Sequence, residues 1–198
     1  MNDPVTLLGL TTTYIELAGF LLAVITVALN IAQLHWAWLF SIISSAVYAI
    51  VFCQSRLYGD MALQFVFIAV SLWGWYQWLH GGAGRAELEV TTSSAKAYGW
   101  SVAGWLAGFG VLALFLARFT DTDVPVADGF LTAGSLVGQV LLSRKKVENW
   151  IVWIIVDVLY VGLYVYKGLM LTAVLYAIFV LMAAFGLFTW YRAAKKIA

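Results

Sequence analysis

Long apolar runs are the feature that most restricts what this chain of 198 residues can fold into. A helix needs about 20 mainly apolar residues to cross a bilayer, and the usual range is about 17 to 25. Seven segments meet this length, and they are continuous rather than alternating over about ten residues as a transmembrane strand would be. We therefore predict an all-α membrane protein with seven transmembrane helices. The segments are 14–34, 36–53, 58–79, 97–119, 124–142, 149–166 and 168–191.

Composition supports the membrane prediction and excludes the common soluble classes. Apolar residues make up 64% of the chain and charged residues 11%, whereas an ordinary soluble domain carries about 25% charged residues. Eleven basic and ten acidic residues leave a net charge of +1, so we expect a lipid bilayer as partner and no nucleic acid. The start of the chain has no basic region before its apolar core, so we expect the first apolar segment to be retained rather than cleaved as a signal peptide.

The reactive residue types are sparse. One cysteine, Cys53, cannot form an intrachain disulfide, and the two histidines lie at span ends. No HExxH, GxSxG or CxxC motif occurs. We therefore expect no enzyme activity, no metal and no cofactor.

The basic residues in the loops predict the orientation. With seven crossings, three of these residues fall on one side of the membrane and eight on the other. The more basic side is expected in the cytoplasm, which places the N-terminus outside and the C-terminus inside. The three are Arg56, Arg118 and Lys167, and the eight are Arg85, Lys96, Arg144, Lys145, Lys146, Arg192, Lys195 and Lys196.

The chain also shows an internal repeat. A shift of 112 positions without gaps aligns chemically distinctive residues: Trp38 with Trp150, Tyr48 with Tyr160, Gly74 with Gly186 and Trp78 with Trp190. We predict a first three-helix repeat over 1–80, a linker plus connecting helix over 81–123, and a second three-helix repeat over 124–198. Corresponding helices are separated by an even number of crossings, so the 3+1+3 repeat is parallel. In such transporters the substrate site lies between the halves, near the midplane.

The sixth span carries the strongest candidate site. Trp150, Trp153, Asp157, Tyr160 and Tyr164 follow one another at spacings of 3, 4, 3 and 4, which puts them on one helical face. A carboxylate in mid-membrane is costly unless it is paired, solvated or neutralised, so Asp157 is a functional candidate. Indole faces attract cations and stack on rings, which suits a flat cationic solute. The alternative is a structural aspartate that ties helices together.

Polar stripes on other spans add candidates. Amides and hydroxyls both donate and accept hydrogen bonds, so they can bind ribose hydroxyls or a carboxamide. They can equally join helices to one another, and both interpretations stay open. The glycine pairs Gly104–Gly108 and Gly134–Gly138 favour close helix contacts. The candidates are Gln64, Gln139, Ser41, Ser45 and Tyr48.

The run Ser143-Arg-Lys-Lys-Val-Glu-Asn-Trp-Ile-Val-Trp-Ile-Ile-Val-Asp157 resembles the sixth-helix signature, V-E-N-W-x-x-W-x-x-x-N/D, of the PnuC family of bacterial vitamin transporters. Gln64 with Gly74-Trp75-Tyr76-x-Trp78 resembles the family's third helix, and the resemblance covers nearly the whole chain. It implies a SWEET-like 3+1+3 fold, a homotrimer in the bacterial inner membrane, and uptake of nicotinamide riboside by facilitated diffusion with trapping by phosphorylation. It also implies that Trp150, Trp153 and Asp157 contact substrate, with Gln64 a further contact.

One departure from the motif bears on the substrate. Nicotinamide riboside carriers of the family have asparagine where this chain has Asp157, and the family also contains thiamine transporters. Both substrates are cationic heteroaromatics. Our hypothesis is nicotinamide riboside first and thiamine second, and a SWEET-like sugar carrier, a proton-coupled transporter and a non-transporting scaffold are the alternatives. The expected substrate-binding residues are Trp150, Trp153, Asp157, Gln64, Tyr160, Gln139, Ser41, Ser45 and Tyr48.

Overall fold

The computed structural model describes residues 4–7, 10–54, 58–166, 168 and 170–197. These residues form seven α-helices, and each predicted span coincides with one of them. The largest difference lies at the end of the last helix, which continues to Ile197 because its final turns remain helical although they are basic. The helices are α1 Tyr14–Ile31, α2 Trp36–Gln54, α3 Tyr58–His80, α4 Ala95–Phe119, α5 Pro125–Ser143, α6 Asn149–Tyr166 and α7 Met170–Ile197.

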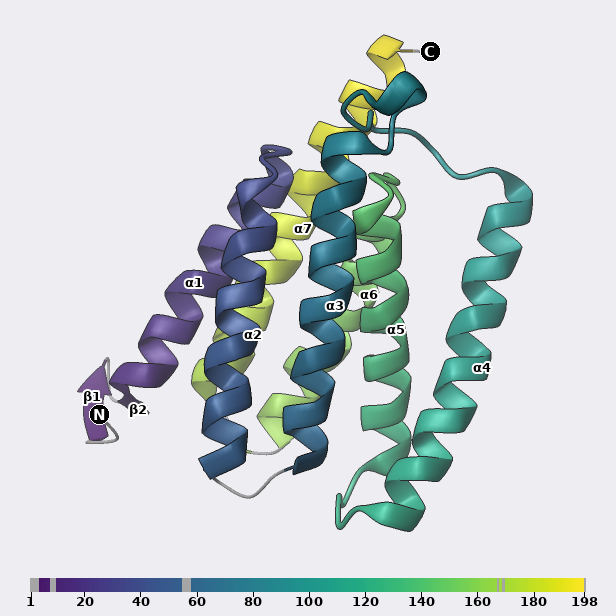
Figure 1. The fold of residues 1–198 in the computed structure, drawn as a ribbon. Helices are drawn as coiled ribbons and strands as arrows, with labels where there is room; N and C mark the ends of the chain where they lie inside the picture. The colour runs from purple at the N-terminus through teal and green to yellow at the C-terminus, as the bar shows by residue number, and fades with distance from the viewer. Residues whose placement is uncertain (1–3, 8–9, 55–57, 167, 169, 198) are drawn as a thin grey trace. The chain divides into compact units, whose positions relative to one another are not determined.

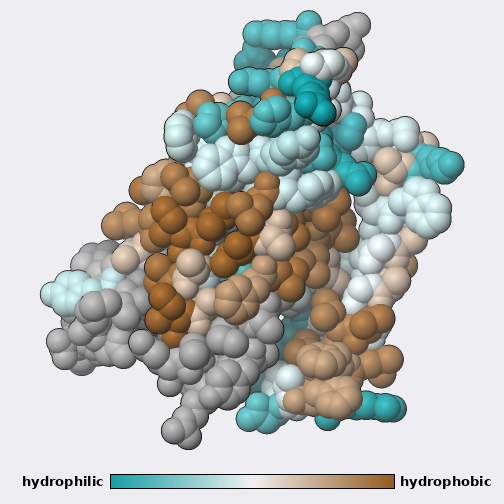
Figure 2. All heavy atoms as spheres, viewed as in Figure 1, coloured by the Kyte–Doolittle hydropathy of each residue, from teal (hydrophilic) through white to brown (hydrophobic). Residues whose placement is uncertain are grey.

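Several helices are suited to a hydrocarbon environment. Within the described part of the chain, α4, α5, α6 and residues 172–196 of α7 are long and apolar enough to span a membrane, and α1 and α2 contain shorter apolar stretches. Large apolar side chains on α4 point outward, and Val111 is 68% exposed. In Figure 2 hydrophobic residues cover the middle of the visible helices, and hydrophilic residues gather at the end of α7 that carries the C-terminus. This distribution indicates a multi-pass membrane protein.

The helices pack into two compact units, Met1–Leu88 and Glu89–Ala198. In the first unit α2 packs against both α1 and α3. In the second, α5 packs against α4 and α6, and α6 packs against α7 (Figure 1). The boundary between the units falls in the stretch predicted as the linker. The loops that hold Arg56 and Lys167 lie outside the described residues.

A short β-hairpin precedes α1. Strand β1 (Pro4–Leu7) pairs antiparallel with β2 (Leu10–Thr13), and Pro4 lies opposite Thr13. This hairpin lies outside the predicted all-helical pattern. The β-branched residues favour extended backbone, but strands of four residues are too short to reveal an alternating pattern.

The linker is attached to the loop that precedes α6. Thr91 pairs with the 145–147 backbone: its N–H donates to the Lys145 carbonyl over 3.1 Å, and Val147 N–H donates to the Thr91 carbonyl over 3.0 Å. Glu148 is buried and accepts from the Ser93 N–H at 2.9 Å and the Ser93 hydroxyl at 2.8 Å. Ser94 then caps α4 by accepting from the backbone N–H of Ala97. These contacts hold the starts of α4 and α6 together.

Candidate functional site

The α5–α6 loop fixes the start of the helix that carries the candidate site. Lys145 adopts a positive φ of 48°, which turns the chain sharply. The side-chain amide of Asn149 donates to the Lys146 carbonyl over 2.6 Å, and this residue is fully buried. The motif residues Glu148 and Asn149 thus stabilise the loop and orient α6.

Trp150 packs into the contact between α6 and α7. Its ring lies edge-on to Trp190, with the ring centroids 5.4 Å apart and the planes at 89°. Gly186 makes room for it, since a Cβ there would lie 2.7 Å from Trp150 Cε2. The side chain is 2% exposed, and its indole N–H has no acceptor among the described residues. In this conformation the indole is covered by α7, and its predicted role in substrate contact stays a prediction.

Trp153 faces α5 instead. A Cβ on Gly138 would lie 3.1 Å from Trp153 Cε2, and Trp153 itself is half-buried. Gly134, one turn earlier on α5, lies against Trp105 and Val156. The expectation that Gly134 and Gly138 mark close helix contacts is confirmed. The two motif tryptophans therefore pack against different neighbours, although they share one predicted face.

Asp157 lies beside a group of three tyrosines, which we call the tyrosine cluster: Tyr160 and Tyr164 of α6 and Tyr176 of α7. The rings of Tyr160 and Tyr164 are stacked with centroids 5.5 Å apart, and Tyr176 lies 4.8 Å from the first and 5.1 Å from the second. Tyr176 is close enough to Asp157 for electrostatic interaction. The Tyr160 hydroxyl faces Ser135 and Thr132 of α5. The cluster thus joins α5, α6 and α7, and Tyr176 is the member that interacts with Asp157.

The environment of Asp157 is unusual for a carboxylate. Its side chain is 4% exposed, and no described residue donates a hydrogen bond to it. A buried carboxylate without a partner is costly, and a cationic ligand would remove that cost. Aromatic rings beside it would add cation–π attraction and ring stacking. The arrangement is therefore chemically suited to a flat, cationic ring.

Tyr176 is the member of this group that sequence reasoning missed. A signal for it was present, because the shift of 112 positions pairs Tyr176 with Gln64, which is itself a predicted site residue. It was overlooked because tyrosine in an apolar helix is common at membrane interfaces. Gln139 is half-buried on α5.

The candidates of the first unit are described within that unit. The hydroxyl of Ser41 lies 3.0 Å from that of Ser71, which is fully buried on α3. Ser45 is buried, Gln64 is half-buried, and the Tyr48 hydroxyl packs against Gly19 of α1. For Ser41 the structure thus shows the helix-joining role. Its role in binding, like that of the other three, stays a prediction.

A second tryptophan pair in the first unit matches the one in the second. Trp38 and Trp78 are edge-on, with centroids 5.5 Å apart and planes at 87°. A Cβ on Gly74 would lie 2.5 Å from Trp38 Cη2. The residues that the shift of 112 pairs with these three are Trp150, Trp190 and Gly186.

A buried carboxylate and a cluster of aromatic rings on apolar helices are typical of a membrane protein that handles a solute. The sequence profile of the family described as "Nicotinamide mononucleotide transporter" matches residues 13–192. The chain belongs to this family, which is the PnuC family of vitamin transporters, and it is not an enzyme.

Individual relatives support the assignment. The nicotinamide riboside transporter PnuC of Escherichia coli K12 is 25% identical over 95% of this chain and 89% of its own. The riboflavin/roseoflavin transporter RibM of Streptomyces davaonensis is 28% identical over 91% of this chain and 86% of its own. A solved structure, "Crystal structure of the Vitamin B3 transporter PnuC", has the same fold, with a TM-score of 0.73, 22% identity, and coverage of 93% of this chain and 83% of that one. The chain is a multi-pass membrane transporter of the vitamin class.

Proposed function

We propose that this transporter takes up a cationic heteroaromatic vitamin, with nicotinamide riboside as the first candidate. The observation that carries the proposal is Asp157, a 4% exposed carboxylate with no hydrogen-bond donor among the described residues, beside the tyrosine cluster. The pyridinium ring of nicotinamide riboside is flat and positively charged. It would compensate the carboxylate while stacking on aromatic rings. Gln64, Gln139, Ser41 and Ser45 would serve the ribose and carboxamide.

The negative charge of Asp157 also decides the order in which we place the other candidate substrates. A mononucleotide would bring a phosphate to a site whose charged group is negative, and like charges repel strongly in a low-dielectric interior. Riboflavin has a neutral ring system and leaves the carboxylate uncompensated. RibM is nevertheless 28% identical to this chain, so riboflavin must be tested directly. Thiamine ranks second because it is also a cationic heteroaromatic.

The proposed mechanism is facilitated diffusion through a parallel 3+1+3, SWEET-like repeat, with net accumulation by phosphorylation inside the cell. The two tryptophan pairs support the repeat, because the 112-position shift relates one pair to the other. In both pairs the rings lie edge-on, and one ring packs against a glycine at the equivalent position. We further propose a homotrimer in the bacterial inner membrane with the C-terminus in the cytoplasm. Trimerisation rests on the family resemblance, and the orientation rests on the basic loops.

Isothermal titration of the detergent-purified protein tests the substrate. Nicotinamide riboside, thiamine, riboflavin and nicotinamide mononucleotide are titrated separately into the same preparation. We expect saturable binding of nicotinamide riboside and no heat from the mononucleotide or riboflavin. Binding of thiamine alone would reassign the carrier to thiamine, and binding of riboflavin alone would refute charge compensation as the basis of recognition.

Uptake into proteoliposomes tests the mode of transport. A facilitated carrier equilibrates labelled nicotinamide riboside at a rate that a protonophore does not change. If a protonophore stops uptake, Asp157 acts as a proton relay and the passive mechanism is wrong. Competition by a neutral sugar would favour the sugar-carrier alternative.

A further inference from the structure

The second unit contains a groove whose lining includes none of the proposed vitamin-binding residues. It lies between α4 and α5, and its volume is about 480 Å³. Gly104 leaves the groove open, because a Cβ at this position would meet no atom within 4 Å. The expected close helix contact therefore forms at Gly108, which lies near Ala133, and not at Gly104. The apolar part is lined by Gly104, Gly108, Ala133, Leu136, Val137 and Val140.

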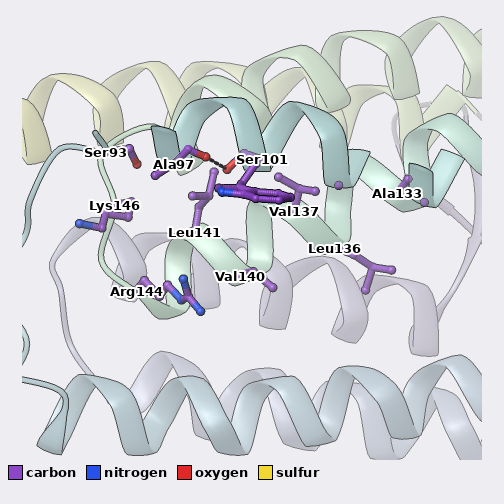
Figure 3. Close-up of a pocket in the computed structure, with 13 residues that line it drawn as sticks. Ser93, Ala97, Ser101, Ala133, Leu136, Val137, Val140, Leu141, Arg144 and Lys146 are labelled. Carbon is purple, nitrogen blue, oxygen red and sulfur yellow. Dashed lines mark hydrogen bonds between the residues drawn. The ribbon is translucent and has the colours of Figure 1, made fainter. Parts of the chain in front are cut away.

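One end of the groove is basic. Arg144 and Lys146 line it there together with Ser93, and Ala133 and Leu136 line the opposite end (Figure 3). The Lys146 ammonium donates to the Thr91 hydroxyl over 2.7 Å and reaches the Thr92 carbonyl at 3.5 Å, so both of these acceptors are neutral. The lining residues include no carboxylate. The groove thus joins an apolar slot to two positive charges.

The basic end coincides with the end of the helices. Residue 143 is the last of α5 and residue 95 is the first of α4, so Arg144 and Lys146 follow the one helix and lie beside the start of the other. Trp100 also lines the groove and is 71% exposed. Exposed tryptophans near helix ends are typical of the membrane interface. This position predicts that the basic end lies at the depth of lipid head groups and that the apolar part extends into the hydrocarbon layer.

One acid, Glu148, lies next to this end, because its carboxylate accepts hydrogen bonds from the lining residue Ser93. Glu148 is 6% exposed and is not among the lining residues. Its carboxylate accepts from the backbone and the hydroxyl of Ser93, and it also interacts with Tyr98. Glu148 therefore offsets part of the positive charge, and the two basic residues Arg144 and Lys146 still leave this end with a net positive charge.

We propose that this groove binds one anionic phospholipid, with an acyl chain along the glycine-lined slot and the phosphate at Arg144 and Lys146. Charge complementarity selects the lipid class, because basic pockets between transmembrane helices attract anionic head groups and a zwitterionic lipid gains less there. The site is separate from the candidate vitamin site and does not depend on which vitamin is carried.

Native mass spectrometry of the intact chain tests the charge. The protein is equilibrated in detergent with equimolar phosphatidylglycerol and phosphatidylcholine, and bound lipids are counted. We expect one retained phosphatidylglycerol per chain, and we expect the double variant Arg144→Gln/Lys146→Gln to lower its retention at least about fivefold. Arg192→Gln/Lys195→Gln is the matched control. It removes two positive charges from the last turns of α7, where these side chains lie over the rings of Phe188 and Tyr191, and should leave retention unchanged.

Filling the slot gives an independent test. Gly104→Leu should block the acyl chain and lower phosphatidylglycerol retention without loss of thermal stability, because the position is open. Gly110→Leu is the control, since Gly110 is equally open but does not line the groove. Equal loss of phosphatidylglycerol in Arg144→Gln/Lys146→Gln and in its control Arg192→Gln/Lys195→Gln would overturn the proposal. Displacement of the lipid by glycerol phosphate would also overturn it and would assign the site to phosphate alone. A changed oligomer mass in Gly104→Leu would overturn it as well and would assign the groove to a second copy of the chain.

Discussion

At the scale of single residues, the surroundings of Asp157 bear on whether this aspartate is structural or functional. A structural aspartate in a membrane hydrogen-bonds a neighbouring helix, whereas no described residue donates a hydrogen bond to this carboxyl. Tyr176 brings an aromatic ring beside it from α7. The substrate-binding role of Asp157 stays a proposal, and its charge is the property to test.

Substitution of Asp157 should separate charge from hydrogen bonding. Asp157→Ala removes both and should abolish measurable binding of nicotinamide riboside. Asp157→Asn introduces the residue that nicotinamide riboside carriers of the family have here. It keeps an acceptor oxygen and should retain binding, weakened about 5- to 20-fold, which corresponds to about 1–2 kcal/mol for one lost charge interaction. Titration calorimetry measures both affinities.

The control for these variants is Asp121→Ala, which removes an exposed carboxylate outside the helices. It should bind like the wild type. Wild-type affinity in Asp157→Ala, with the protein still folded, would refute the assignment of the site.

At the scale of elements, the α2–α3 and α6–α7 hairpins are each packed through a tryptophan ring that lies against a glycine. Trp38 fits against Gly74 in the α2–α3 pair, and Trp150 fits against Gly186 in the α6–α7 pair. The indole rings are rigid and nearly fully buried. Even one added methyl group therefore has no space, because packed interiors cannot absorb it without displacing the ring.

Alanine at either glycine should destabilise its hairpin. We expect Gly74→Ala and Gly186→Ala each to cost about 1–3 kcal/mol, read as a lower thermal unfolding temperature in detergent. Gly162→Ala on α6 is the control, because a Cβ there meets no atom within 4 Å, and alanine favours the helix over glycine. Unchanged unfolding temperatures for Gly74→Ala and Gly186→Ala would mean that the rings shift freely.

The contact between the linker and the α5–α6 loop is the other element-scale feature with a measurable consequence. Glu148→Ala leaves the Ser93 N–H without its buried acceptor, which typically costs about 1–3 kcal/mol. Hydrogen exchange should therefore accelerate at residues 91–94. Glu89→Ala, at an exposed position of the same linker, should leave exchange there unchanged, and equal protection in the two variants would contradict the role of Glu148.

At the scale of the whole molecule, the proposed orientation follows from basic residues that bracket the spans. Of the residues predicted on the cytoplasmic side, Lys195 and Lys196 lie in the last turn of α7. A basic helix end next to the membrane is retained in the cytoplasm because its transfer across the bilayer is costly.

Reporter fusions test this orientation. Green fluorescent protein fused after residue 198 should fluoresce, and alkaline phosphatase fused at the same place should be inactive because it remains in the cytoplasm. The opposite pair of results would invert the topology and place the basic end of the α4–α5 groove in the outer leaflet.

The sequence by itself determined the membrane class and the seven helices, because the length of an apolar run is a local property set by bilayer thickness. It also identified Asp157, since a carboxylate in such a run is conspicuous without any knowledge of packing. The two tryptophan pairs lie at positions that the shift of 112 related beforehand. The first two conclusions depend on residues close together in the chain, and the third depends on comparing two segments of the same sequence.

Only the tertiary structure decided what each side chain faces. It covered Trp150 with α7 and turned Trp153 toward α5, although one helical face was predicted for both. It brought Tyr176 to Asp157 from another helix, joined Ser93 to Glu148 across 55 positions, and left an open groove at Gly104. These outcomes depend on which helices are neighbours and on the volumes of the facing side chains, and helical periodicity contains neither.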